Sequence, residues 1–184
     1  MIIGIVGLPG SGKTSLSGIM KRRGFKVLEM GDIVRKGMAR EGVPLTGPGM
    51  REYANALKSR HGKDWIAKEA MKEISMRRLS GKDFAVSSIR TPEEVLYFRR
   101  RLRRMVIIGL VAPPETRFRR LMRRGRKDDP KSRKGFELRE RKESGWRTPE
   151  AVRMADYVLC NTGTIADLRT GMDEVLKNLK GRKK

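Results

Sequence analysis

The sequence predicts an α/β fold in which one parallel sheet of five strands lies between layers of helices. Short apolar runs alternate with longer segments in which the apolar residues have helical spacing, such as Leu16, Ile19 and Met20. This alternation is typical of parallel strands joined by crossover helices. The run at residues 105–111 is continuously apolar, as expected for a strand covered by helices on both faces. The five expected strands are residues 2–6, 25–29, 84–87, 105–111 and 156–160.

Two segments depart from this regular alternation. Residues 31 to about 80 form a long helical stretch, in which glycines and prolines predict loops at residues 42–44 and 47–49. Residues 123–147 are dense in Arg, Lys, Asp and Gly and poor in apolar side chains, so we expect a mobile flap rather than part of the core. The length of 184 residues fits a single domain that carries both segments.

Residues 7–14 form a motif that binds phosphate. They match the pattern G-x-x-x-x-G-K-[ST] at every fixed position, directly after an apolar strand and before a helix. Such glycines let backbone N–H groups surround phosphates at the positive end of the following helix. Lys13 would reach the β and γ phosphates, and the Thr14 hydroxyl would ligate Mg²⁺. The motif predicts an ATP–Mg²⁺ site built by Gly7, Leu8, Pro9, Gly10, Ser11, Gly12, Lys13, Thr14 and Ser15.

Charged residues follow the second and third expected strands. Asp32 and Arg35 come after the second strand, and Arg90 comes after the third. Because the carboxyl ends of parallel strands meet at one edge of a sheet, we expect both arginines to lie on the same side of the sheet as the phosphate loop. A guanidinium holds a phosphoryl group with two parallel hydrogen bonds. Each arginine alone also fits a surface charge, but their joint position favours a functional role.

These two segments resemble motifs of adenylate kinases and other nucleoside monophosphate kinases. Residues 31–35 are similar to their G-D-x-x-R motif, and residues 87–90 to their D-G-x-(P)-R segment. The resemblance implies that Asp32 lies near the metal, directly or through water, and that Asp32, Arg35 and Arg90 bind the acceptor. Where those kinases place Asp-Gly, this chain has Ser87-Ser88. A serine can hydrogen-bond a metal-bound water but supplies no charge, so both slow catalysis and an ATP-binding switch stay open.

The flap at residues 123–147 resembles the arginine-bearing lid of small P-loop kinases. Cations that arrive only when a lid closes stabilise the transferring phosphoryl group and exclude water. Any one of these arginines also fits a solvated surface. Asn161 follows the last strand and fits the loop that borders adenine in these kinases, and equally an ordinary turn before a helix. The resemblance implies catalytic roles for Lys13, Arg90, Arg124, Arg126 and Arg139, and a nucleotide-binding role for Asn161.

Over nearly its whole length the chain is similar to a largely archaeal family of adenylate-kinase-related proteins, with a more distant likeness to dephospho-coenzyme A kinase. The resemblance implies a three-layer P-loop NTPase fold over residues 1–184, like that of nucleoside monophosphate kinases. It implies a helical acceptor-binding insertion at about 31–80 and an Arg-rich lid at about 123–147. The implied activity is transfer of the γ-phosphoryl of ATP, with Mg²⁺, to a small nucleotide or nucleoside-like acceptor.

The net charge of +23 exceeds what nucleotide binding requires. Attraction to nucleic acid and a heat-adapted charged surface explain it equally well. The main alternative is therefore an ATPase or ATP-dependent switch that acts on RNA or a ribonucleoprotein, with the basic run at residues 99–104 as a contact. The chain has only 2 Trp, 3 Tyr and 5 Phe, and no strand interleaves aromatic and basic residues, which argues against base readout.

Two further expectations concern location and the single cysteine. No apolar stretch approaches the length of a membrane span, so we expect a cytoplasmic protein without a membrane partner. Cys160 ends an apolar run, and we expect it to be a small buried hydrophobic residue.

Overall fold

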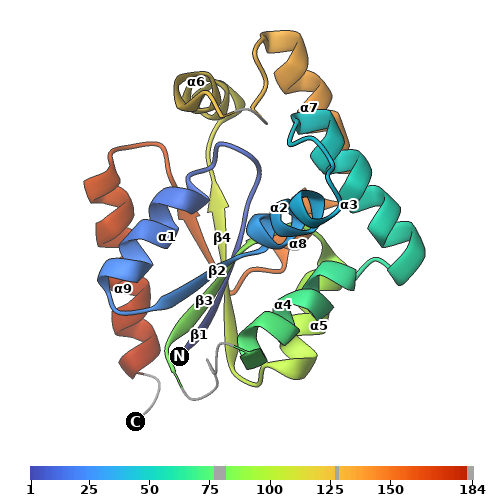
Figure 1. Cartoon of the computed structure of the whole chain (residues 1–184). Helices are drawn as coiled ribbons and strands as arrows, with labels where there is room; N and C mark the ends of the chain where they lie inside the picture. Colours follow the sequence, from blue (N-terminus) through green and yellow to red (C-terminus); the bar gives the residue numbers. More distant parts are fainter. Residues whose placement is uncertain (77–81, 127–128, 182–184) are drawn as a thin grey trace.

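The computed structural model confirms the expected α/β architecture (Figure 1). It describes residues 1–76, 82–126 and 129–181. The five strands form one sheet in the order β2-β3-β1-β4-β5, and every neighbouring pair is parallel. The strand that leads into the phosphate loop is thus central. The strands are β1 (Ile2–Val6), β2 (Lys26–Glu29), β3 (Phe84–Ile89), β4 (Met105–Val111) and β5 (Tyr157–Cys160), so all five expected strands are present.

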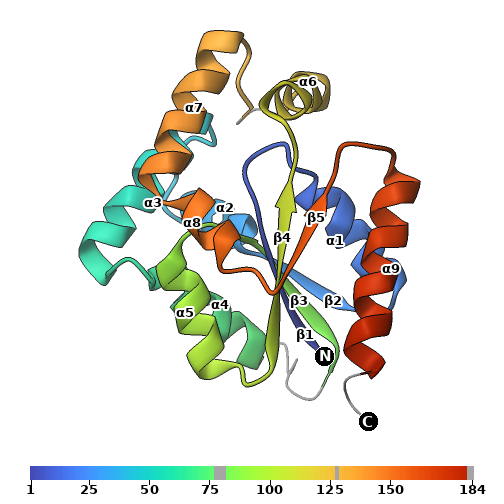
Figure 2. The ribbon, with the colours of Figure 1, turned by 180° about the vertical axis from the view of Figure 1, so that it is seen from behind.

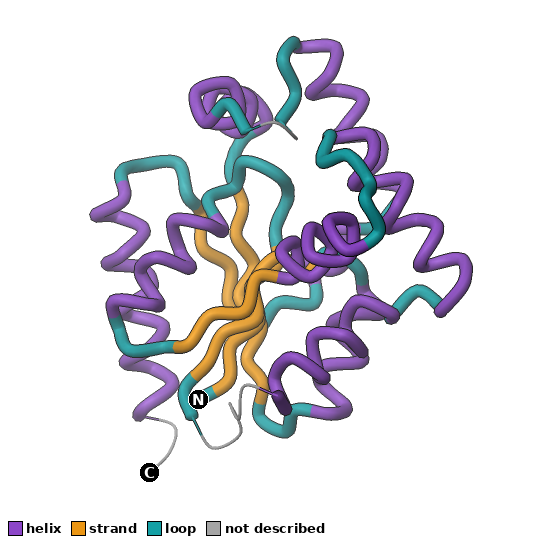
Figure 3. The backbone as a smooth tube through the Cα atoms, in the orientation of Figure 1, coloured by secondary structure: helices purple, strands orange, loops and turns teal. Residues whose placement is uncertain are grey.

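Helices cover both faces of the sheet. Figures 1 and 2 show α1 and α9 on one face and α2, α4, α5 and α8 on the other, and Figure 3 shows the strands enclosed between the two helical layers. Both α6 and α7 lie beyond the carboxyl ends of the strands, at the end of the molecule opposite the N-terminus. The helices are α1 (Lys13–Arg22), α2 (Met30–Arg40), α3 (Gly47–His61), α4 (Trp65–Met76), α5 (Pro92–Arg101), α6 (Pro114–Arg124), α7 (Arg133–Gly145), α8 (Thr148–Arg153) and α9 (Ile165–Gly181).

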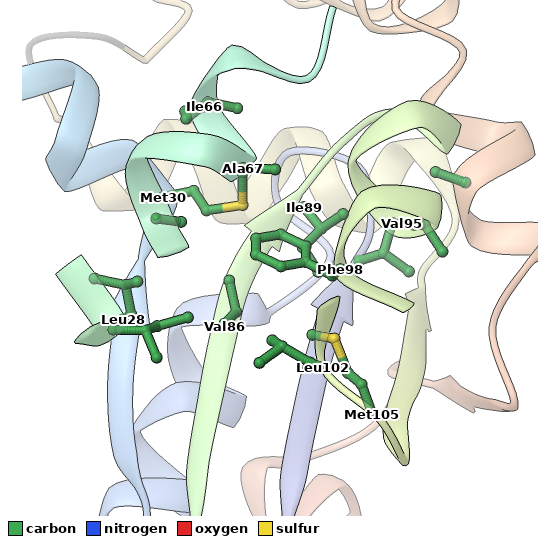
Figure 4. Close-up of a cluster of buried hydrophobic side chains, with 14 of the residues drawn as sticks. Leu28, Met30, Ile66, Ala67, Val86, Ile89, Val95, Phe98, Leu102 and Met105 are labelled. Atoms are coloured by element: carbon green, nitrogen blue, oxygen red, sulfur yellow. The ribbon is translucent and has the colours of Figure 1, made fainter. Parts of the chain in front are cut away.

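The core consists of two apolar clusters separated by the sheet. Phe98 and Val95 of α5 pack with Val86 and Ile89 of β3 in one cluster (Figure 4). The other cluster lies under α1 and α9 and includes Ile5 of β1. Strand residues alternate between the two clusters because successive side chains point to opposite faces. None of the helices within the described ranges is long and apolar enough to cross a membrane.

The acceptor-side insertion contains the helices α2, α3 and α4. The expected break at residues 42–44 is confirmed, since α2 ends at Arg40. The expected loop at residues 47–49 is wrong, because these residues form the first turn of α3. The Thr46 hydroxyl accepts the Gly49 N–H at 3.0 Å, and Pro48 lies in the first turn, where its missing N–H costs nothing.

Two expectations about burial are wrong. The segment 123–147, expected to lie outside the core, buries Phe136, which is 2% exposed and packs outside the two clusters with its ring centroid 5.5 Å from that of Phe118. Composition alone hides this contact because one aromatic residue anchors the polar helix α7. Cys160 is exposed, because β5 is an edge strand whose residues alternate between half-buried and exposed.

Candidate active site

The phosphate loop owes its shape to two glycines. Gly10 and Gly12 have positive φ angles of +78° and +107°, which other residues adopt only with strain. A Cβ atom on Gly12 would lie 2.1 Å from Nδ2 of Asn161, and one on Gly10 would lie 2.6 Å from the carbonyl oxygen of Arg117. Both positions therefore need glycine for conformation and for space, although the motif fixes glycine only at position 12 and leaves position 10 open.

Lys13 points back into the phosphate loop. Its Nζ donates to the carbonyl oxygens of Gly7 at 2.6 Å and Leu8 at 3.0 Å. The pKa of Lys13 is lowered from 10.5 to about 7, mainly by burial and also by the charges of Arg90 and Arg139, while the carboxylates of Glu143 and Glu29 oppose the shift. An anion bound at the loop would relieve this penalty, so the electrostatics of the site favour phosphate.

This lowered pKa predicts proton uptake when a nucleoside triphosphate binds. At pH 8, a group with a pKa of about 7 is roughly nine-tenths neutral, whereas phosphate contact favours the charged form. Binding of ATP at pH 8 should therefore take up close to one proton. Calorimetric titrations in buffers of different ionisation enthalpy measure this number, and Lys13→Met should reduce it to near zero. Wild-type uptake no greater than that of the variant would contradict the prediction.

The same shift gives a pH dependence of stability. Between pH 7 and 10.5 the unfolded chain holds a proton on Lys13 that the nucleotide-free folded chain does not. The contribution of this group to the free energy of unfolding therefore rises with pH across that window.

A basic cleft of about 670 Å³ opens from the phosphate loop. We call it the phosphate cleft. Nine Lys and Arg side chains line it against two carboxylates, those of Glu29 and Asp32, so it attracts anions. Thr14 lines it as well. The cationic side chains are Lys13, Lys21, Arg35, Arg90, Arg120, Arg123, Arg124, Arg126 and Arg139, which include every arginine with an expected catalytic or acceptor-binding role.

The acceptor-side arginines each have a carboxylate partner. Arg35 pairs with Asp32 at 2.6 Å on the open side of the cleft. Arg90 pairs with Glu143 of α7 at 3.3 Å, and Glu143 is only 2% exposed. Thr148 donates its hydroxyl to the other oxygen of Glu143 at 3.2 Å. Glu143, in the segment expected to form the lid, therefore positions Arg90. The sequence pattern does not predict this role for Glu143.

The lid arginines converge on Asp129. Nε of Arg124 lies 2.8 Å from Oδ2 of Asp129, and Nη1 of Arg139 lies 3.3 Å from Oδ1. The backbone N–H of Arg126 donates to Oδ2 at 3.1 Å. Burial alone would raise the pKa of Asp129, but the hydrogen bonds and charge of Arg124 lower it. Asp129 thus holds the side chains of Arg124 and Arg139, and the backbone at Arg126, beside the cleft. Residues 127 and 128 of the expected lid lie outside the described residues.

Asn161 supports the phosphate loop from behind. It is 6% exposed, and its Nδ2 donates to the carbonyl oxygen of Ser11 at 2.8 Å. Its own carbonyl oxygen accepts from Arg120 at 3.0 Å. Asn161 does not line the phosphate cleft, and neither do Gly7, Leu8 and Ser11 of the loop. The sequence does not predict the contact of Arg120 with Asn161, because Arg120 is one of several arginines in α6.

A second, smaller pocket of about 50 Å³ adjoins the phosphate cleft. We call it the inner pocket. Lys58 and Arg90 make cation–π contacts with the ring of Trp146. Nζ of Lys58 lies 4.4 Å and Cζ of Arg90 lies 5.3 Å from the ring centroid. The inner pocket shares Gly31, Met50, Ser88, Arg90 and Arg139 with the phosphate cleft. Its other lining residues are Met30, Val34, Gly47, Arg51, Ala54, Lys58, Trp65, Ile66, Glu94, Glu143 and Trp146.

The fold and the phosphate cleft define a P-loop protein of the kinase type, and comparison with known proteins places it in a family. Residues 6–136 match the AAA domain family, to which the chain belongs. UPF0200 protein PH1008 of Pyrococcus horikoshii is 33% identical over 181 residues, which cover 97% of each chain. UPF0200 protein MJ1399 of Methanocaldococcus jannaschii is 34% identical over 100% of this chain and 95% of that protein. The chain thus also belongs to the archaeal UPF0200 family, and the expected membership of a P-loop kinase family is confirmed.

Solved structures share the fold. TT1252 from Thermus thermophilus is 25% identical, with a TM-score of 0.66 and coverage of 97% of each chain. A shikimate kinase from Acinetobacter baumannii in complex with shikimate is 18% identical, with a TM-score of 0.65 over 97% of this chain and 94% of that one. A gluconokinase from Sinorhizobium meliloti 1021 is also 18% identical, with a TM-score of 0.56 over 99% and 97%. The two kinases establish the shared fold alone.

Proposed function

We propose that the protein is a kinase that transfers the γ-phosphoryl group of ATP to a small nucleotide or nucleoside-like acceptor. One observation carries the proposal: the phosphate cleft and the inner pocket adjoin, and Arg90 and Arg139 line both. A protein that only bound and hydrolysed ATP would need no second chamber beside the phosphates. Two adjoining chambers with shared arginines suit two substrates that meet at one phosphoryl group.

The lining of the inner pocket suits an acceptor with an apolar or planar body and polar edges. Met30, Val34 and Ile66 supply apolar walls beside the flat ring of Trp146. Nε of Arg51 and Nε1 of Trp65 are buried donors that find no hydrogen-bond partner among residues 1–76, 82–126 and 129–181. Leaving such donors unpaired is costly, so a bound acceptor that offers hydrogen-bond acceptors would gain from meeting them.

In the proposed mechanism the phosphate loop binds ATP, and the lid stabilises the transferring phosphoryl group. Lys13 binds the β and γ phosphates, while Arg90 and Arg35 hold the acceptor side. The proposed lid, residues 123–147, brings Arg124, Arg126 and Arg139 against the transferring group and excludes water. Thr14 would hold Mg²⁺, which when bound offsets the negative charge shared by the phosphates. Catalysis then consists of positioning and charge stabilisation.

The test measures ADP formation with ATP, Mg²⁺ and a panel of acceptors, comprising nucleoside monophosphates, nucleosides, dephospho-coenzyme A, shikimate, gluconate and total RNA. One small acceptor should raise ADP formation. Replacing Lys58, which lines the inner pocket, by Gln should raise the KM for that acceptor about tenfold, consistent with loss of one charged contact. The KM for ATP should stay unchanged.

Lys68→Gln is the matched control, because Lys68 lies on α4 outside both chambers. It should leave both KM values unchanged. Stimulation by RNA alone, or ATP binding without turnover under any condition, would refute the small-molecule kinase.

An RNA-associated ATPase or ATP-dependent switch is the second candidate function. It is favoured by Arg100, Arg103 and Arg104, which are exposed and pair with no carboxylate among residues 1–76, 82–126 and 129–181. These arginines precede β4, whereas the phosphate loop follows β1, so they lie at opposite edges of the parallel sheet. RNA bound there would be far from the phosphate cleft. The two-chamber site therefore favours the kinase.

A further inference from the structure

The serine pair that replaces the expected Asp-Gly has a carboxylate beside it on the neighbouring strand. In the ladder between β2 and β3, Glu29 is in register with Ser87. Side chains in register on parallel strands lie on the same face of the sheet. That face carries α1, because Ala85, two residues before Ser87, packs in the cluster with Leu16 of α1. Glu29 and Ser87 therefore both face the helix that begins with Lys13 and Thr14.

Glu29 is held in place at the phosphate cleft. Its Oε2 accepts a hydrogen bond from the Ser88 hydroxyl at 3.2 Å. Ser88 adopts a φ of +71°, in the left-handed region that non-glycine residues rarely occupy. Glu29 lines the cleft together with Lys13 and Thr14, and its charge acts on Lys13. Ser88, at the irregularity near the end of β3, thus fixes a carboxylate that belongs to β2.

Two buried serine hydroxyls, one on α1 in the cleft lining and one in register with Glu29, have no partner in the described part of the chain. Oγ of Ser17, which is 3% exposed, and Oγ of Ser87, which is 0% exposed, make no hydrogen bond to any described residue. Ser17 lies three residues after Thr14 on α1 and lines the phosphate cleft. Buried hydroxyls usually find a partner, and an unpaired one in a polar site commonly contacts a water or an ion. Hydroxyls and a carboxylate form the all-oxygen environment that Mg²⁺ prefers.

Asp32, the carboxylate expected from the resemblance, is less suited to the metal. Its side chain is 58% exposed, and it already pairs with Arg35 at 2.6 Å. The positive charge of the Arg35 guanidinium already offsets the charge of this carboxylate, which weakens its attraction for a metal. Its position in the first turn of α2 also gives it a structural role at the positive end of that helix.

We propose that Glu29 is the carboxylate that holds the hydration shell of the nucleotide-bound Mg²⁺, with the hydroxyls of Ser17 and Ser87 as hydrogen-bond partners of the same waters. This inference rests on the proposed binding of ATP. Mg²⁺ keeps several waters and is held by one or two carboxylates together with substrate phosphates. Accordingly, the described part of the chain has no cluster of three or more His, Cys, Asp or Glu that could hold a metal alone. Glu29 of β2 thus supplies the carboxylate that Ser87 of β3 lacks.

The test compares nucleotide affinity with and without metal, by calorimetry with adenylyl imidodiphosphate, an ATP analogue that resists hydrolysis. The wild type should bind it more tightly with Mg²⁺ than with EDTA. Glu29→Gln should lower the ratio of the two affinities about tenfold, with the EDTA value unchanged or tighter because a negative charge beside the triphosphate is gone. Ser88→Ala, which removes only the hydroxyl that holds Glu29, should lower the ratio two- to threefold, consistent with loss of one hydrogen bond.

Asp32→Asn is the matched control, because it makes the same carboxylate-to-amide change in the same cleft. It should leave the ratio at the wild-type value. The metal assignment would be overturned if Glu29→Gln and Ser88→Ala kept the wild-type ratio of affinities with Mg²⁺ and with EDTA. It would also be overturned if Asp32→Asn lowered this ratio as much as Glu29→Gln. Either outcome would leave the kinase proposal standing. A wild type that binds no nucleotide in either condition would overturn both.

Discussion

Replacing Lys13 by methionine is expected to lower the rate of phosphoryl transfer about 10³-fold without weakening the fold. Loss of a preorganised donor at a developing charge costs about 10²–10³ in rate, and Lys13 also carries a full charge, which places it at the upper end. The folded protein bears a cost for burying this ammonium, as its pKa of about 7 indicates. Methionine removes that cost together with two hydrogen bonds to loop carbonyls, so the thermal midpoint should change little or rise.

The measurement pairs single-turnover transfer rates with thermal unfolding of the same samples. Lys21→Met is the matched control, because Lys21 also lies on α1 and lines the phosphate cleft but is not part of the loop motif. It should reduce the rate only a few-fold, as expected for a screened surface charge. Equal losses in the two variants would show that general positive charge, rather than the contact of Lys13 with phosphate, drives transfer.

The phosphate loop could be predicted from sequence because its requirements are local. Gly10 and Gly12 need positive φ angles, and the strand before and helix after them are visible as apolar patterns. The positions of the five strands also follow from local signals, since each apolar run is short and flanked by helical spacing, whereas the order β2-β3-β1-β4-β5 comes from the structure. Register and packing then place Arg35 and Arg90 along one cleft, as expected for residues after the carboxyl ends of parallel strands.

The partners of the arginines could not be predicted. The chain has 44 Lys and Arg, so no sequence pattern shows which of them meets Glu143 or Asp129. Those choices depend on how α7 packs over the sheet, and α7 has a single strong apolar anchor in Phe136. The role proposed for Glu29 could not be predicted for a related reason. Glu29 is in register with Ser87 only because β2 and β3 pair in the sheet, and the spacing of residues in the sequence does not show this pairing. Contacts across elements are therefore the main information that the structure adds.

The contact between Arg117 and Glu140 is the clearest case of such a hidden interaction, and it predicts the largest loss of stability. Arg117 of α6 has a side chain only 4% exposed, and it makes a two-armed ion pair with Glu140 of α7. It also donates to the carbonyl oxygens of Ala112 at 3.0 Å and Pro9 at 3.4 Å. One guanidinium thus joins the phosphate loop, the start of α6 and the middle of α7.

Glu140→Ala is expected to lower the free energy of unfolding by about 3 kcal/mol, because it leaves a buried guanidinium without its counter-charge. The value is at the low end for a buried pair because the side chain of Glu140 is 24% exposed. Urea denaturation at neutral pH measures it. Glu137→Ala, on the same helix, removes an exposed ion pair with Arg133 and should cost less than about 0.5 kcal/mol. If the two variants were equally stable, Arg117 would have to be solvated in solution, and the link between α7 and the phosphate loop would not exist.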